Sequence, residues 1–528
     1  MTKKIISILI LLCVIVSAFT GCFGRKKSGE AFSMPIMDEP TSLDPQIADS
    51  NSEKLVAANC YEGLVRIMAD GTIGKGVATD WNVSDDGLTY TFKLRNNSHW
   101  AMFSGHKAVL GENYEDTFDI TVKAEDFKFG IERTLSEQTG SADAPLFSAV
   151  KSISTPDDFT VVFNLSYADD NFMYALTSPG AMPCDEEFFN LTNGKYGLDA
   201  KYLLCNGPFH VSKWTEKTSV KLVKNNEYNG ETAVSPSSVT FYINNDDSEV
   251  ADKMNSVTYD AAFLSSSQFS SVENKKDLNS VAVQNVTYSF IFNQNDNNYR
   301  NKNMRLAFCR SCDTSSLFDS QSDISKADGI VPPSCKIGGE DYRGENGANL
   351  LSYDETLAKK NFNDALLELG TSSVETTILC TEQYESFVKQ MVQKLQKTLG
   401  VKFVSTVKAV SESDLEAAVN DGNYSVAFYP FKAKSAFAGE IIEGFDQNNI
   451  FGYESDVLSQ KIRNIKNNSG SLEGERSAVA DAENYLVSEA VIMPVFYENS
   501  YFVTSKKTSG IYFYSSADNV YFINAKKS

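Results

Sequence analysis

The feature of this sequence that most constrains its fold is a regular alternation of helix and strand patterns in its third quarter. Residues 382–399 carry an apolar side chain at every fourth position, as in an amphipathic helix, at Phe387, Met391, Leu395 and Leu399. Two short β-rich stretches, 401–406 and 424–429, then flank a second predicted helix at 412–420. Strands separated by a helix pair in parallel through a right-handed crossover. This part of the chain is therefore predicted to be an α/β domain with an open sheet.

Length and charge limit the class of protein. The chain has 528 residues, which is too long for one hydrophobic core and predicts two or three domains. Apolar residues make up 42% of it, enough for packed cores. The net charge of −21 argues against nucleic acid as a partner, because phosphate binding needs a basic face. After the first 27 residues no stretch approaches 18 apolar residues, so no transmembrane helix is expected there.

Local patterns place further elements outside the α/β domain. Alternation of apolar and polar residues predicts strands at 31–37, 88–94 and 160–165. Apolar residues at helical spacing predict helices at 51–66, 122–136 and 303–318. Gly71, Gly74 and Gly76 are spaced too irregularly for a phosphate-binding loop, so we interpret them as turns.

The first 27 residues have the order of a secretory signal peptide: two lysines, an apolar run at 5–19 and then small residues. The run is 15 residues long, shorter than the roughly 20 that a membrane-spanning helix needs. It ends at Gly21-Cys22, which resembles a bacterial lipobox, although Phe19 stands where that box usually has leucine. We therefore expect residues 1–21 to be a removed signal peptide and Cys22 to be lipidated. The protein would then be held on the outer face of the cell membrane, or in the periplasm of a cell with two membranes. An ordinary signal peptide, or an anchor with an incidental cysteine, is the alternative.

No group of residues in the sequence predicts catalysis, a metal site or a cofactor. His99 and His106 are seven apart with acids nearby, and we interpret them as part of a surface hairpin. Cys309 and Cys312 have redox or metal spacing but fall within a predicted helix, so we interpret them as structural. Zinc-protease, serine-hydrolase and Walker motifs are absent. A secreted hydrolase is therefore disfavoured, and we expect no enzyme.

A series of stretches in a fixed order carries a family resemblance that runs from about Glu39 to the C-terminus. The stretches are "EPTSLDPQIADS", "YEGLVR", "GVATDWNVSDDGLTYTFKLRNNSHW", "ITVKAEDFKFGIERTL", "NGPFHVSKWTEKTSVKLVKNNEYNG", "YSFIFNQNDNNYRNKNMRLAFCRSCD", "YDETLAKKNFNDALLELG" and "AVIMPVFYENSYFV". Each is weak alone. Together they resemble the extracellular solute-binding proteins of family 5, the peptide/nickel class, which are the binding subunits of oligopeptide and dipeptide ABC importers.

This resemblance implies an α/β, periplasmic-binding-protein-like fold with two lobes, type II, of the large cluster with an extra subdomain. Mixed sheets flanked by helices are expected. Lobe I is predicted at 31–77, 205–301 and 488–528, after a linker at 22–30. An inserted subdomain of lobe I is predicted at 78–204, and lobe II at 302–487.

The candidate ligand site follows from the end of the strand predicted at 424–429, because open α/β sheets bind ligands beyond the carboxyl ends of their strands. Pro430 is predicted to end that strand, since proline removes a ladder donor. The backbone from Phe428 to Lys434 would be free to pair with an extended ligand as an added strand. The site residues predicted here are Phe428, Tyr429, Pro430, Phe431, Lys432 and Lys434. From lobe I, Ser265 and Ser266 resemble a ligand-facing loop of the family. In both places the alternative is a loop that packs on itself.

Lys434 departs from the family pattern. In peptide-binding relatives an aspartate at this position neutralises the α-ammonium of the peptide, whereas a lysine would repel it by roughly 1–4 kcal/mol at 4 Å. The ligand could have a blocked or neutral end. It could present a carboxylate to Lys432 or Lys434. A third alternative is that Glu440, Glu443 or Asp446 receives the amine.

The resemblance implies a function in capture and delivery. A monomeric, lipid-anchored receptor would close on a small solute, expected to be a peptide, and pass it to the permease subunits of an ABC importer. A sensor of peptide signals on the same fold, and a binder of a non-peptide solute, remain alternatives.

Overall fold

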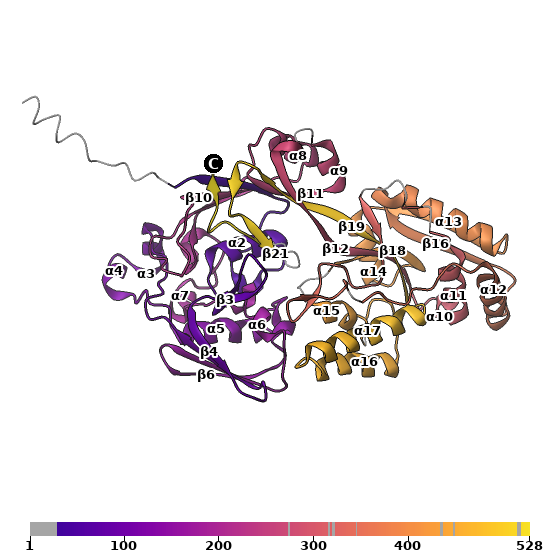
Figure 1. Ribbon diagram of the computed structural model, residues 1–528, viewed down its shortest axis with the longest axis horizontal. Helices are drawn as coiled ribbons and strands as arrows, with labels where there is room; N and C mark the ends of the chain where they lie inside the picture. The colour runs from indigo at the N-terminus through magenta and orange to yellow at the C-terminus, as the bar shows by residue number, and fades with distance from the viewer. Residues whose placement is uncertain are drawn as a thin grey trace, which may run out of the picture.

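The structure is a computed structural model of the chain. It describes residues 29–272, 275–314, 317–318, 323–344, 346–432, 437–446, 449–514 and 519–528. These residues form two lobes joined by long strands (Figure 1). Across these ranges, no helix has the length and apolar character needed to cross a membrane. The predicted signal peptide, Cys22 and Lys434 lie outside the described residues.

Lobe I contains two four-stranded sheets. The first has the order β1 (Ala31–Ile36), β10 (Ser238–Ile243), β9 (Ser219–Lys224) and β8 (Phe209–Thr215). The second has the order β4 (Ala78–Val83), β5 (Thr89–Leu94), β7 (Thr160–Leu165) and β6 (Val150–Asp157). The helices α2 (Asn51–Cys60) and α5 (Ala124–Leu135) share one hydrophobic core with both sheets. The region predicted as an inserted subdomain therefore packs into the core of lobe I.

A seven-stranded sheet connects the lobes. Its order is β11 (Ala261–Ser265), β19 (Ile492–Ser505), β12 (Leu278–Phe292), β18 (Val426–Lys432), β16 (Val374–Thr381) and β17 (Phe403–Val410), with β13 (Ile324–Lys326) also paired to β19. β12 and β19 are long enough to run from lobe I into lobe II (Figure 1). Their register shifts between Val283 and Val286, where Gln284 Nε2 donates to Asn499 Oδ1 at 2.7 Å. The lobes are therefore joined by paired strands with an irregularity at the crossing.

Helices cover both faces of the sheet in lobe II. On one face lie α11 (Lys302–Ser311), α12 (Glu355–Leu369) and α13 (Glu385–Leu399). On the other lie α14 (Glu412–Asn420), α15 (Ala438–Glu443), α16 (Asp456–Asn467) and α17 (Leu472–Ser488). β16 is parallel to both β17 and β18. The predicted α/β fold with an open sheet is confirmed.

Several predicted boundaries are wrong. The helix predicted at 51–66 ends at Cys60, and Val65–Ile67 instead forms β2, which pairs with β3 (Ile73–Lys75). The helix predicted at 303–318 stops at Ser311. Pro430 does not end β18, because Tyr288 of β12 still pairs with it. Proline is tolerated in a ladder where its nitrogen faces an unpaired edge, and pairing with β16 ends at Ala427.

The C-terminal segment returns to lobe I. Phe522 is buried in its core and contacts Phe32 of β1, with 6.2 Å between ring centroids. Asn59 of α2 donates to Val520 O at 2.7 Å and accepts from Phe522 N at 3.1 Å. Lys527 pairs with Asp260 at 2.9 Å. Lobe I is therefore completed by the last residues of the chain.

Candidate ligand-binding cleft

A cavity of about 360 Å³ lies between the lobes. Its lobe I wall consists of residues 34–38 at the end of β1, together with Asn51, Ser52, Leu55, Val250 and Phe263. Its opposite wall comes from the crossing strands and β18: Asn285, Val286, Lys432, Glu498 and Ser500. β1 is the edge strand of its sheet. A molecule bound here would touch both lobes.

β18 has one paired and one open edge near this cavity. It pairs with β12 from Val426 to Lys432, but with β16 only at Val426 and Ala427. On the β16 side, residues 428–432 therefore extend beyond the strand pairing. Such an edge offers main-chain groups to an extended peptide.

The predicted residues of β18 have different environments. Phe428 is 1% exposed and its ring contacts Phe496 in the core of lobe II, so its side chain does not face a ligand. Tyr429 and Phe431 are half-buried against the α14–α17 face, where Phe431 stacks on Phe445 at 5.7 Å. Lys432 lines the interlobe cavity.

The two predicted serines of lobe I have structural contacts. Ser265 caps α9 (Ser266–Ser271), and its hydroxyl accepts from Gln268 N at 3.2 Å. Ser266 is 5% exposed and donates to Asn499 O of β19 at 2.7 Å. On the same strand as Ser265, Phe263 lines the cavity instead. The serines therefore fix α9 against the crossing strand.

Glu498 lines the cavity but was not among the site residues predicted from the sequence. It lies on β19 and accepts a hydrogen bond at Oε1 from Tyr384 Oη, 2.6 Å away. Burial raises the pKa of Glu498, and the bond from Tyr384 partly opposes that rise. The cavity therefore holds a partly desolvated carboxylate on its lobe II wall.

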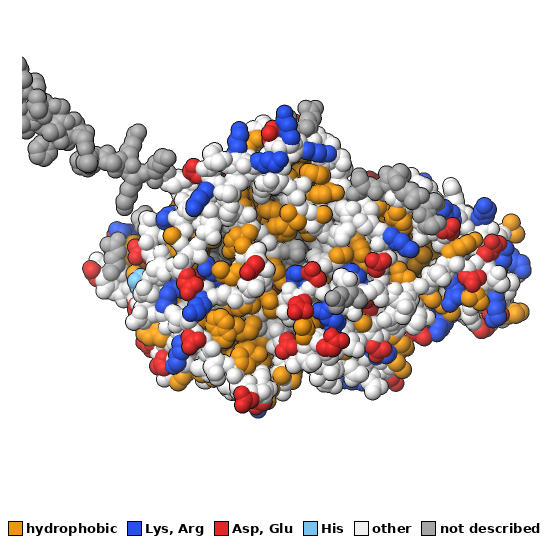
Figure 2. Space-filling model, in the orientation of Figure 1, with side chains coloured by type: hydrophobic (Ala, Val, Ile, Leu, Met, Phe, Trp, Pro, Cys, Tyr) orange, Lys and Arg blue, Asp and Glu red, His pale blue; other side chains and the backbone are white. Residues whose placement is uncertain are grey.

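The lobes also meet at a second place, which we call the acidic seam: Asp169 and Asp170 of lobe I with Glu443 and Glu475 of lobe II. Asn171 Nδ2 donates to Glu475 Oε1 at 2.8 Å, and Asn171 Oδ1 accepts from Gly338 N at 3.1 Å. Burial raises the pKa of Glu475 to about 8 and that of Asp169 to about 6. Figure 2 shows acidic side chains close together where the lobes meet.

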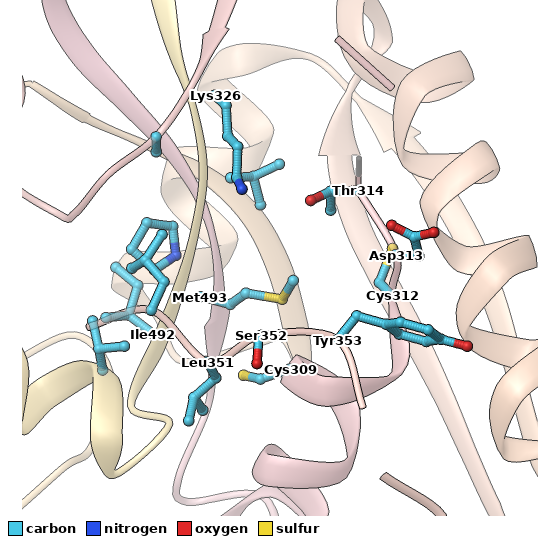
Figure 3. A pocket seen from close by; sticks show the side chains of 15 residues that line it. Cys309, Cys312, Asp313, Thr314, Lys326, Leu351, Ser352, Tyr353, Ile492 and Met493 are labelled. Atoms are coloured by element: carbon cyan, nitrogen blue, oxygen red, sulfur yellow. The ribbon is translucent and has the colours of Figure 1, made fainter. Parts of the chain in front are cut away.

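A separate cavity of about 230 Å³ lies within lobe II (Figure 3). Cys309, at the end of α11, and Cys312 line it with Lys326 and Met493. Both cysteines are free thiols, and burial raises the pKa of each to about 12. Thiols of such high pKa are unreactive at neutral pH, which agrees with a structural role.

His106 is not on a surface hairpin, so that interpretation is wrong for this residue. Its side chain is buried, with Nε2 3.1 Å from Leu203 O, beside the ring of Phe103. Burial lowers its pKa to about 4, so the ring is neutral near pH 7. In the part of the chain that the structure describes, no three His, Cys, Asp or Glu side chains are grouped to hold a metal.

Two lobes around a cavity, joined by paired strands, define a ligand-binding protein of the periplasmic-binding-protein class. The model of the bacterial extracellular solute-binding proteins, family 5, matches residues 72–450, and the chain belongs to that family.

Two relatives of known binding function align with this chain over most of its length. The chain is 24% identical to the dipeptide-binding protein DppE of Bacillus subtilis over 497 residues, covering 90% of this chain and 88% of DppE. It is 23% identical to the oligopeptide-binding protein OppA of the same organism over 562 aligned residues, covering 99% of this chain and 98% of OppA.

Solved structures show the same fold. Listeria monocytogenes OppA bound to peptide superposes with a TM-score of 0.74 at 22% identity, covering 95% of this chain and 100% of that one. The dipeptide-binding protein from Pseudoalteromonas sp. SM9913, in complex with Met-Leu, superposes with a TM-score of 0.75 at 17% identity. The match covers 94% of this chain and 100% of that one. The predicted two-lobe fold is confirmed.

Proposed function

We propose that this protein is the substrate-binding component of an ABC importer, which captures an extracellular peptide or peptide-like solute and delivers it to the permease. The observation that carries the proposal is the interlobe cavity, which lies between the edge strand β1 and the end of β18. Sheet edges bind extended peptides through main-chain hydrogen bonds. The relatives are dipeptide- and oligopeptide-binding proteins, which supports a peptide as the solute.

Closure is the proposed mechanism. A solute that touches both walls of the cavity stabilises the closed arrangement of the lobes over the open one, and so shifts a pre-existing equilibrium. The permease would then recognise the closed shape. A lipid on Cys22 would keep the receptor at the membrane, on its extracellular face.

Native mass spectrometry of the purified protein, mixed with a random library of peptides of two to eight residues, tests the solute class. We expect one peptide bound per chain, with an affinity measurable by calorimetry. Retention of a non-peptide solute, with no peptide bound at any concentration tested, would contradict the proposal. Deletion of the gene separates import from sensing, because an importer subunit predicts loss of labelled-peptide uptake and a sensor does not.

A further inference from the structure

The lobe II wall of the interlobe cavity presents a carboxylate in a fixed position. Glu498 lies on β19 opposite Val286 of β12 and Ile324 of β13, so its backbone is paired on both sides. Its side chain reaches the cavity and is held at Oε1 by Tyr384 Oη at 2.6 Å. Tyr384 is in turn 8% exposed and packed against Tyr288, with 4.5 Å between ring centroids. The carboxylate is therefore preorganised.

The charges around Glu498 leave this wall negative. Glu412, in the first turn of α14, adds to the raised pKa of Glu498, whereas Lys432 of β18 lowers it. Burial raises the pKa of Tyr384, and the charges of Glu498 and Asp323 raise it further. On the lobe I side, Asp38 also lines the cavity. Among the described charged groups near Glu498, acids thus outnumber the one lysine.

A carboxylate that has lost water is stabilised best by a cation that donates hydrogen bonds to it. Tyr384 supplies one donor to Glu498 and Gln383 a second, whereas a carboxylate has about four acceptor sites. A peptide offers two groups of the right chemistry, its α-ammonium and the ammonium of a lysine side chain. Both are compact cations with three donors.

We propose that Glu498 receives an ammonium group of the bound peptide and so selects peptides that carry a free amino group. This rests on the proposed function. It places the acidic partner on β19 and not among the predicted candidates Glu440, Glu443 and Asp446, which lie on or just after α15. Glu443 belongs to the acidic seam, where Lys466 pairs with it at 3.6 Å.

Three peptide libraries of three to five residues test the proposal. The first has free α-amino groups and no Lys or Arg, the second is the same but N-acetylated, and the third is N-acetylated with one lysine. Wild type is expected to bind the first or the third library at least about tenfold more tightly than the second, the loss typical of one charge-assisted hydrogen bond. The library that binds identifies the ammonium as α-amino or side-chain.

The variant Glu498→Gln replaces the carboxylate with an amide of nearly the same size. Its affinity for the library that wild type prefers is expected to fall by about tenfold or more, while its affinity for the acetylated, lysine-free library stays unchanged. Glu412→Gln removes a neighbouring carboxylate that does not line the cavity, and its effect is expected to stay below about threefold. An unchanged thermal unfolding midpoint shows that each variant folds. The proposal would be overturned if wild type bound all three libraries with equal affinity. It would also be overturned if Glu498→Gln kept the full preference for peptides with a free amino group. Absence of binding by all three libraries would instead refute the peptide-binding function itself.

Discussion

Replacing Glu483 with alanine is expected to lower the free energy of unfolding by about 3–5 kcal/mol. Glu483 lies on α17, and its side chain is 1% exposed. It accepts from the backbone of Ile330 at 2.6 Å and of Val331 at 3.0 Å, and it pairs with Arg343, whose side chain is 5% exposed. The variant leaves a buried guanidinium without its counter-charge and two amides without their acceptor. Urea unfolding followed by circular dichroism measures the loss.

Asp481 provides the matched control on the same helix. Its carboxylate is 60% exposed and pairs with Lys461. Exposed pairs contribute little, so Asp481→Ala is expected to cost less than about 1 kcal/mol. A loss below about 1 kcal/mol for Glu483→Ala as well would show that the buried pair does not hold lobe II together.

Closure of the lobes is expected to weaken by a few kcal/mol as the pH rises from about 5 to 8. In the structure, where the lobes meet at the acidic seam, Glu475 is 3% exposed, its Oε1 accepts from Asn171, and its Oε2 is buried without a hydrogen-bond partner among the described residues. Burial raises the pKa of this carboxyl from 4.5 to about 8. The form in which the lobes meet at this seam therefore holds a proton on Glu475 that the open form releases. Protonation of Glu475 contributes fully to the free energy of closure below pH 4.5, and this contribution is lost as the pH approaches 8. Each pH unit in that window contributes at most about 1.4 kcal/mol.

Small-angle scattering or a fluorescence pair across the lobes measures this dependence. Asp169, Asp170 and Glu443 act in the same direction, because burial raises the pKa of each. Glu475→Gln retains an acceptor for Asn171 without a charge and is expected to flatten the pH profile markedly. Glu473→Gln, in the exposed first turn of the same helix, is expected to leave the profile as in wild type. A profile for Glu475→Gln identical to that of wild type would contradict the explanation.

Sequence periodicity predicted the elements whose packing is local. The stripe of apolar residues on α13 and the helix α14 between two strands are set by short-range spacing, and both occur as predicted. The helix predicted at 51–66 failed because the segment after Cys60 turns into the strand β2, whose partner β3 is fixed by tertiary contacts. Pro430 was misjudged because its effect depends on which edge of β18 is open.

The site was harder to predict because its walls come from strands far apart in sequence. Lys432 could be placed from the end of a predicted strand, but residues 34–38 and Phe263 face it only because β12 and β19 carry the chain across between the lobes. Glu498 did leave a signal. It is the one charged residue in the stretch "PVFYENSYFV" of the long strand β19.

The return of the C-terminal segment to lobe I has a consequence for how the protein is made. Residues 286–498 form the sheet of lobe II from one unbroken piece, so that lobe can fold while the ribosome is still translating the message. Lobe I begins first but waits for Val520 and Phe522 to reach Asn59 before its core is complete. The half that is translated earliest is thus expected to complete its core last, after residues 520–522 have been made.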